Sequence, residues 1–297
     1  MQGYEALREK AAWRQLDGRG RILVHGEDNA RLLHAMSTQD IQSLQDGQGL
    51  YCFFLTAQGR IQADAYVFRT GADFLLDTES STAQWLFEHL DKYIIADDVT
   101  LEDLRDSHTT LAVEGPASLE CGWPVPAADL GIVPYAGGYV VRASETGLPG
   151  LRWIHPRAAE LSIELPEADL DSWETVRLEQ GKPRYGVEIL DKHLVQETRQ
   201  LQAVHFSKGC YLGQEIVERV RARGQVHKGL ASIAITATEA LDVGAEIQSG
   251  DTKVGNLLSA RYSPALGHVV GFAMLSTDAL SGTQELRCSS YSVRLFK

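Results

Sequence analysis

The chain has 297 residues, of which 44% are hydrophobic and 23% are charged, and its formal net charge is −12. Its length exceeds the size at which a single core stops growing, so two or three domains are expected. The composition is typical of a globular protein, and the negative charge argues against direct binding to nucleic acid. No apolar run approaches the roughly 18 residues that a membrane-spanning helix needs.

The first ten residues are polar and mixed in charge, which is unlike a secretory signal. The four cysteines are far apart and form no Cys-x-x-Cys pair, so we expect reduced thiols in a cytoplasm rather than disulfides. The nine histidines form no His-Glu-x-x-His motif. A complete metal site within the chain is therefore not expected, although a cluster shared with a second protein through Cys210 stays open.

Hydrophobic periodicity in the first half predicts an α+β unit with helices on one face of a sheet. The expected helices cover 4–16, 27–36 and a segment after Ser81, and the expected strands cover 21–26, 50–56, 61–68, 74–77, 99–104 and 109–113.

The second half begins with a region rich in proline and glycine, 121–156, in which one strand is predicted at 138–143. Helices are expected at 170–180 and 214–223, each closed by a glycine. Short β runs then predict a small antiparallel barrel or sandwich from about residue 226 onward. They cover 229–236, 245–249, 252–261, 268–274 and 285–296.

One short segment combines a thiol, two glycines, a lysine and a Gln-Glu pair. A thiol beside a lysine and a helix N-terminus is placed to ionise more readily than a free cysteine. The alternative is a tight loop–helix junction in which the cysteine is a small buried hydrophobe, and composition alone favours this alternative. The segment reads Lys208-Gly209-Cys210-Tyr211-Leu212-Gly213-Gln214-Glu215.

Asp64 lies on the strand expected at 61–68, where alternation places Gln62, Asp64 and Tyr66 on one face. Either Asp64 faces water on an amphipathic strand, which the pattern alone favours, or it faces a cavity and accepts a ring N–H or an amine.

Charge is also unevenly distributed along the chain. Residues 208–228 hold five basic and two acidic residues, a net +3, and the remainder carries −15. Such a segment could hold a polyanionic ligand or form a solvated helix face.

The segment Lys208–Glu215 resembles the hallmark Lys-Gly-Cys-aromatic-x-Gly-Gln-Glu of the YgfZ family. That family is related to the folate-dependent aminomethyltransferase (T-protein, GcvT) of the glycine cleavage system. Three further stretches, 33–40, 54–64 and 177–186, are similar to segments of this superfamily and occur in the same order.

The resemblance implies a three-domain ring that binds tetrahydrofolate, with two intertwined α+β subdomains over 1–225 and an antiparallel β-barrel over 226–297. It also implies a role in the synthesis or repair of Fe–S clusters, including those of tRNA-modifying enzymes. The partners would be Fe–S assembly proteins or Fe–S client enzymes. The alternatives are a one-carbon transferase with a structural cysteine and an adaptor that binds no folate, so whether the chain is an enzyme stays undetermined.

The resemblance implies catalytic roles for Cys210 and Asp64. Cys210 is the cysteine of the hallmark motif, and Asp64 falls where aminomethyltransferases have their essential aspartate. It implies folate contacts for Asp64, Arg177, Glu197 and Lys208, with the basic residues of 208–228 binding the glutamate tail.

The sequence departs from the aminomethyltransferase pattern in one turn. Where aminomethyltransferases carry Thr-Gly-Glu-x-Gly-x-Glu, an acid of which helps to hold the pterin, residues 146–152 contain neither carboxylate. Donors left unpaired at a pterin site cost about 1–3 kcal/mol each, so glycine-cleavage activity is not expected.

Overall fold

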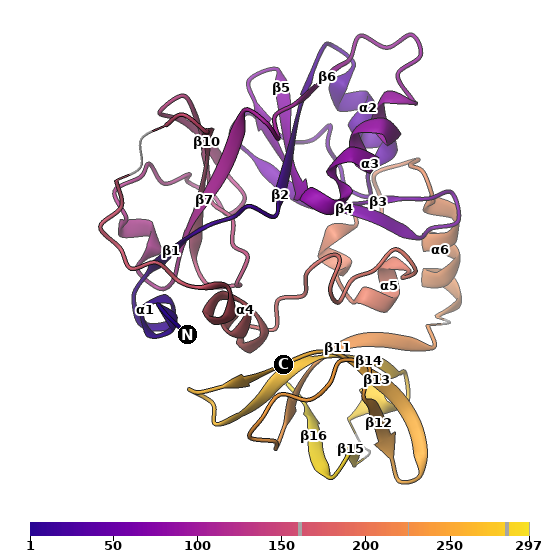
Figure 1. Ribbon diagram of the computed structural model, residues 1–297. Coiled ribbons are helices and arrows are strands. Elements are labelled where there is room, and N and C mark those ends of the chain that lie inside the picture. Colours follow the sequence, from indigo (N-terminus) through magenta and orange to yellow (C-terminus); the bar gives the residue numbers. More distant parts are fainter. Residues whose placement is uncertain (160–161, 225, 283–284, 297) are drawn as a thin grey trace.

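Two five-stranded sheets and a closed six-stranded barrel organise the chain (Figure 1). The structure is a computed structural model that describes residues 1–159, 162–224, 226–282 and 285–296. Within these ranges, none of the helices is both long and apolar enough to cross a membrane. The α-helices are α1 (Tyr4–Glu9), α2 (Asn29–Met36), α3 (Ser80–Asp91), α4 (Leu170–Glu179), α5 (Val195–Thr198) and α6 (Gln214–Arg223).

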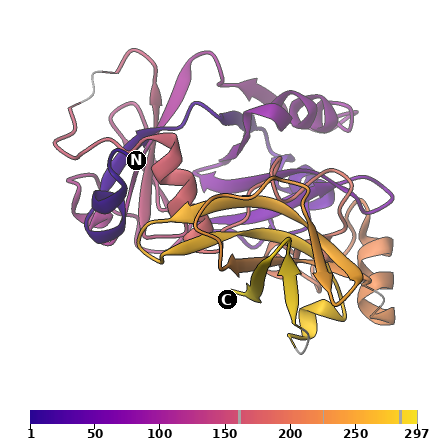
Figure 2. The same ribbon diagram turned by 60° about the horizontal axis from the view of Figure 1, so that its bottom comes forward.

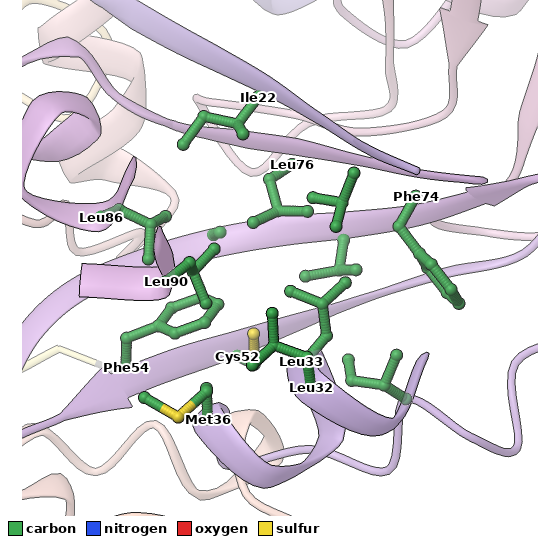
Figure 3. Packing of buried hydrophobic residues seen from close by; sticks show 14 of the residues in the cluster. Ile22, Leu32, Leu33, Met36, Cys52, Phe54, Phe74, Leu76, Leu86 and Leu90 are labelled. Carbon is green, nitrogen blue, oxygen red and sulfur yellow. The ribbon is translucent and has the colours of Figure 1, made fainter. Parts of the chain in front are cut away.

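The first sheet has the strand order β3-β4-β5-β2-β6, and α2 and α3 contribute to the core on one of its faces. Strand alternation buries Ala63, Ala65 and Val67 in this core. Figure 3 shows Cys52 and Leu33 among the packed side chains of the same cluster. The opposite face of β4 therefore carries Asp64. The strands are β2 (Arg19–His25), β3 (Gly49–Leu55), β4 (Ile61–Thr70), β5 (Asp73–Glu79) and β6 (Thr100–Asp103).

The second sheet has the strand order β1-β7-β10-β9-β8. Its first strand follows α1 directly, whereas the next strand of the chain, β2, belongs to the first sheet. The chain thus crosses from one sheet to the other within a few residues, and the two sheets are intertwined. The strands are β1 (Ala12–Gln15), β7 (His108–Glu114), β8 (Ile132–Tyr135), β9 (Gly138–Val141) and β10 (Gly150–Pro156).

The helix predicted over 4–16 is wrong in its second half, because α1 ends at Glu9 and β1 follows. The residues of β1 pair with β7, from Ala12 opposite Glu114 to Gln15 opposite Leu111. Because β7 lies far from β1 in the sequence, the local pattern of residues does not reveal that β1 is a strand. Two strands of the region rich in proline and glycine, β8 and β10, were also not predicted.

The predicted C-terminal antiparallel barrel is confirmed, and it closes through the pairing of β11 with β16. Figure 2 shows the barrel from the side on which its strands come forward. The expected run 285–296 is two strands, because the chain turns at Ser289 with a φ of 54°. The strands are β11 (Lys228–Ile235), β12 (Glu246–Ser249), β13 (Thr252–Ser263), β14 (His268–Ser276), β15 (Leu286–Cys288) and β16 (Tyr291–Leu295).

Buried ion pairs join the two sheets. Asp77 of β5 accepts from Arg19 Nε at 2.9 Å and from Arg152 Nη1 of β10 at 2.7 Å. The side chains of Asp77 and Arg152 are both fully buried. Removing one member of such a group leaves a buried charge without its counterion, which typically destabilises a protein by about 3–5 kcal/mol.

We therefore expect Arg152→Met to lower the free energy of unfolding by about 3–5 kcal/mol in urea denaturation. Arg142→Met is the matched control, because its ion pair with Asp129 is solvent-exposed and should be worth less than about 1 kcal/mol. Equal effects of the two substitutions would contradict the role assigned to Arg152.

Candidate functional site

A cavity of about 190 Å³ lies where side chains of the first sheet meet the loop after β9 and the segments that follow α4 and α5. Both charged and aromatic side chains line it. The lining residues are Arg19, Tyr51, Asp64, Tyr66, Glu79, Leu130, Ser144, Glu145, Lys182, Pro183, Arg184, Gln200 and Gln202.

Asp64 provides a buried acceptor in this cavity. Its residue is only 6% exposed, so the alternative that it faces water is wrong. The Tyr51 hydroxyl donates to Asp64 Oδ2 at 2.7 Å, whereas Oδ1 is buried and has no hydrogen-bond partner among the described residues. Burial raises the pKa of Asp64, against the lowering effects of Arg19 and Tyr51. A donor of a bound molecule would satisfy Oδ1.

Two tyrosine rings form an aromatic wall beside Asp64. The ring centroids of Tyr51 and Tyr66 are 5.0 Å apart, and the guanidinium of Arg152 lies 4.8 Å from the centroid of Tyr66. Lys182 Nζ donates to the Tyr66 hydroxyl at 3.3 Å. Alternation predicted that Tyr66 shares the face of Asp64, and the pairing of Tyr51 opposite Tyr66 brings in the second ring. The planes of the two rings are tilted by 48°, and Lys182 Nζ also lies 5.9 Å from the centroid of Tyr66.

Two glutamates of the cavity have opposite pKa shifts. Burial alone would raise the pKa of Glu145, but Arg152 at 2.9 Å and Arg19 at 3.6 Å outweigh burial and lower it to about 2. Burial raises the pKa of Glu79 to about 8, even though Arg19 lies 2.8 Å away, because Glu145 and Asp64 add repulsion. The surroundings therefore favour the ionised form of Glu145 and the protonated form of Glu79.

Arg177 does not line this cavity. It is buried on α4, and its side chain makes five hydrogen bonds, to Glu174, Glu188 and the carbonyl of Lys182. A guanidinium has five N–H donors, so none is left for a ligand. Arg177 instead fixes the segment that carries Lys182 and Arg184 into the cavity. The expectation that Arg177 contacts folate is therefore wrong, and the role of Arg177 is to support this segment.

Glu197 lies on α5, outside the lining of the Asp64 cavity. Its Oε2 accepts from the backbone N–H of Leu194 at 2.9 Å and so caps the helix. Glu197 lines a different cavity of about 650 Å³, together with His193, His227 and Lys228. The structure thus does not bring Glu197 to Asp64.

Lys208 holds the motif loop against α2 and does not line the Asp64 cavity. Its ammonium donates to the backbone carbonyls of His34 and Ser37 at the C-terminal end of that helix, the latter at 2.7 Å. It also lies 5.0 Å from the ring centroid of Tyr211. Burial lowers the pKa of Lys208 to about 8. The ammonium is therefore engaged with α2, and the structure does not show it activating the Cys210 thiol.

The rest of the motif is anchored by Tyr211, which is buried in a core shared with β3, β4 and the barrel. Gln214 begins α6, and the side chain of Glu215 is exposed. Gly209 has a φ of 97°, which favours glycine there. At Gly213 a Cβ would lie 2.6 Å from the carbonyl oxygen of Thr56 at the β3–β4 turn.

Cys210 is exposed, whereas Cys52 and Cys288 are buried and Cys121 is half-buried. The alternative of a packed hydrophobic cysteine at this position is therefore wrong. Among the described residues, no three His, Cys, Asp or Glu side chains gather as metal ligands would.

The arginines of α6 are exposed, and both ribbon views place this helix at one edge of the molecule (Figures 1 and 2). Arg219, Arg221 and Arg223 are absent from the lining of the Asp64 cavity. The structure therefore favours a solvated helix face over the expected contact with a glutamate tail.

Comparisons with known proteins agree on one fold. Residues 1–124 match the family model described as the GCVT N-terminal domain. An aminomethyltransferase of Rubrobacter xylanophilus is 26% identical over 301 residues, which cover 95% of this chain and 81% of that protein. The aminomethyltransferase T structure of the glycine cleavage system from Bartonella henselae superposes with a TM-score of 0.85 at 18% identity, covering 99% of this chain and 87% of that one.

Two further relatives are longer than this chain. A mitochondrial iron-sulfur cluster assembly factor (IBA57 homolog) of Pyricularia oryzae is 30% identical over 231 residues, covering 73% of this chain and 56% of that protein. A chloroplastic protein of Arabidopsis thaliana, named as a transferase, is 28% identical over 261 residues, covering 81% and 59%. The chain thus spans less than two thirds of the length of each.

The two sheets and the closed C-terminal barrel form an aminomethyltransferase-like fold. The fold of this chain is that of the GCVT family, and the predicted fold class is confirmed.

The pKa of Glu79 generates a prediction. Because its folded-state value of about 8 lies above the ordinary 4.5, its stabilising contribution is present at low pH and is lost as the pH rises between these values. Glu79→Gln keeps the neutral form throughout. We expect the variant to gain on the order of 2–4 kcal/mol relative to wild type between pH 5 and pH 8.5 in urea denaturation. Parallel pH profiles would refute this.

The close approach at Gly213 generates another prediction. Gly213→Ala should lower the free energy of unfolding by about 2–4 kcal/mol, because a Cβ meets Thr56 while φ stays at 85°. Gly18→Ala is the control, since no atom lies within 4 Å of its Cβ position, and it should change stability by less than about 1 kcal/mol. Thermal and urea unfolding measure both, and a neutral Gly213→Ala would contradict the packing described.

Proposed function

We propose that the chain is a folate-binding protein of the YgfZ type that supports the synthesis or repair of Fe–S clusters through Cys210. Its clients would be Fe–S enzymes, including those that modify tRNA. The observation that carries the proposal is the exposure of Cys210 on a loop that is otherwise anchored. The assembly factor of Pyricularia oryzae, to which the chain is similar, supports it.

Tetrahydrofolate fits the chemistry of the cavity. A pterin ring presents N–H and amino donors at its edge, and the cavity offers the buried Asp64 Oδ1 without a partner and the ionised Glu145. The two tyrosine rings would hold its face. Asp64 and Tyr51 would orient the reduced ring or a one-carbon unit attached to it.

The volume indicates that only the ring would be enclosed. Pockets for drug-sized ligands measure about 300–1,000 Å³, whereas this cavity measures about 190 Å³. An adjoining cavity of about 230 Å³ shares Arg19, Glu79, Glu145 and Arg184 as walls. The remainder of the ligand would continue there or into solvent.

The proposed role of the Cys210 thiol rests on two observations: the residue is exposed, and the loop around it is anchored. Lys208 and Tyr211 are fixed on either side of Cys210, so the thiol would be presented outward at a constant place. An exposed thiol can exchange disulfides, carry a persulfide or ligate a cluster shared with a partner. The four free cysteines fit a reducing compartment, and we propose the cytoplasm.

A second candidate is a tetrahydrofolate-dependent one-carbon transferase in which Cys210 has no chemical role. The similarity to an aminomethyltransferase over 95% of the chain favours it. The two candidates differ in the residue that the activity requires. The Fe–S role would require Cys210, whereas the transferase would require Asp64 and not Cys210.

Complementation of a strain that lacks the protein tests the proposal. We expect Cys210→Ala to lose at least about 10-fold of the restored Fe–S enzyme activity, because the exposed thiol is removed without disturbing the core. Cys121→Ala is the matched control and should restore activity fully. Full restoration by Cys210→Ala would overturn the role of the thiol.

Anaerobic calorimetry with tetrahydrofolate completes the test. Wild type and Cys210→Ala should bind alike, and Asp64→Asn should bind more weakly. Absence of binding to wild type would favour an adaptor without folate. One-carbon transfer that survives Cys210→Ala but is lost in Asp64→Asn would establish the transferase instead.

A further inference from the structure

A groove of about 650 Å³ lies between α5, α6 and β11, the first strand of the barrel. Figure 1 shows α6 beside α5, with β11 below both helices. The segment that follows α5 separates this groove from the Asp64 cavity, because alternate residues of the segment line the two sites. Gln200 and Gln202 line the cavity, whereas Arg199 and Leu201 line the groove. The groove is therefore separate from the site proposed for folate.

The groove contains apolar side chains that are in contact with solvent. Leu201 is 47% exposed, and the other four apolar side chains of the lining are half-buried. Apolar surface gathered in a hollow of this size is typical of a site where another molecule binds. These four residues are Phe206, Val220, Val226 and Leu280.

Basic side chains stand beside this apolar surface. Arg199, Arg221 and Lys228 line the groove, and none of its described lining residues is acidic, although the chain has a net charge of −12. Arg221 lies 3.4 Å from Glu218, and Lys228 lies 3.8 Å from Glu197. Such partly exposed pairs contribute little free energy, and Arg199 takes part in no ion pair within the described part of the chain. The cations are thus available to a partner of opposite charge.

Hydrogen bonds hold the walls of the groove in place. Gln196 Nε2 of α5 donates to the carbonyl of Val217 on α6 at 2.8 Å. Beyond the end of α6, the backbone N–H of Thr277 donates to the carbonyl of His227 at 3.0 Å, and its hydroxyl donates to the carbonyl of Val226. A groove that is already formed loses less conformational entropy when a partner binds.

The groove adjoins the loop that carries Cys210. The ring of Phe206 belongs to the lining, and the guanidinium of Arg221 lies 4.4 Å from its centroid. Phe206 precedes Cys210 by four residues, so the two Cα atoms can be at most about 14 Å apart. A protein seated in the groove would therefore have part of its surface close to the exposed thiol.

We propose that this groove docks an acidic, amphipathic segment of the protein that Cys210 serves. Apolar side chains of the segment fill the groove, and its carboxylates pair with the three basic side chains of the lining. Arg219 and Arg223 are also exposed and continue the positive charge along the ten residues of α6. This length, about 15 Å, favours a peptide segment over a small ligand with one carboxylate. The inference rests on the proposed function, since it identifies the chemistry of the partner and the surface that receives it.

A synthetic peptide tests the chemistry of the groove directly. The probe is a fluorescent helical peptide of about four turns, with leucines on one face and glutamates on the other, and the control peptide has lysine in place of each glutamate. In fluorescence anisotropy at low salt, wild type should bind the glutamate peptide at least about 10-fold more tightly than the lysine peptide. Arg199→Glu/Arg221→Glu should abolish this preference. Equal affinity for the two peptides, or absence of binding to the glutamate peptide, would overturn the proposal.

Complementation of the strain that lacks the protein tests the role of the groove. Arg199→Glu/Arg221→Glu should lose at least about 10-fold of the restored Fe–S enzyme activity, because reversed charges repel an acidic partner. Leu201→Ser should lose at least about 3-fold, because it removes an exposed apolar contact. Arg287→Glu/Arg294→Glu is the matched control, since it makes the same change in charge at exposed positions outside the groove, and it should restore activity fully.

Calorimetry with tetrahydrofolate separates docking from a general loss of structure. The affinity of Arg199→Glu/Arg221→Glu and of Leu201→Ser should stay within about 2-fold of wild type, because the groove and the Asp64 cavity share no lining residue. If the charge-reversed variant proves unstable, Leu201→Ser still decides the question. Equal losses of folate affinity and of Fe–S enzyme activity in Leu201→Ser would contradict a docking role.

The outcomes distinguish this inference from the proposed function. If Cys210→Ala restores Fe–S enzyme activity fully, the proposed function fails and the groove has no partner of this kind. If Cys210→Ala fails to restore activity but the charge-reversed variant and Leu201→Ser restore it fully, the assignment of the groove is wrong and the proposed function survives.

Discussion

The buried ion pairs around Asp77 connect the fold to the site. Arg152 of the second sheet and Arg19 of the first sheet both bind Asp77, and both also face Glu145 in the cavity. The same charges therefore fasten two sheets together and determine which carboxyl groups of the cavity stay ionised. Buried ion pairs often contribute little net stability compared with apolar packing. Here they also set the protonation of the lining, which apolar residues could not do.

The β3–β4 hairpin links the two candidate functional features. The face of β4 carries Asp64 into the cavity, while the turn of the hairpin supports Gly213 at the beginning of α6. Cys210 itself lies outside the cavity lining. The hairpin thus lies between the cavity, which it lines through Asp64, and the loop–helix segment that carries the exposed Cys210.

The sequence predicted those features that depend on local pattern. Alternation along β4 predicted that Asp64 and Tyr66 share one face, although the pattern alone favoured water over a cavity for Asp64. The spacing of short strands predicted a barrel or a sandwich, and the structure has the barrel. What the sequence could not predict were distant partners, because β1 pairs with β7, and the cavity brings Arg19 of β2 together with Glu145 from the loop between β9 and β10. Arg177 and Lys208 were expected at a ligand, but sequence does not reveal that their donors are already engaged.

Closure of the barrel has a consequence for recognition by other proteins. Within the described residues, each of its six strands pairs on both sides, so the barrel presents no unpaired edge to another chain. An edge of the first sheet is also guarded, since the Thr38 hydroxyl accepts from the backbone N–H of Phe53 on β3 at 2.9 Å. Strand addition is a common way for one protein to recruit another. At these two places a partner must instead read side chains, and its specificity must come from their shape and charge.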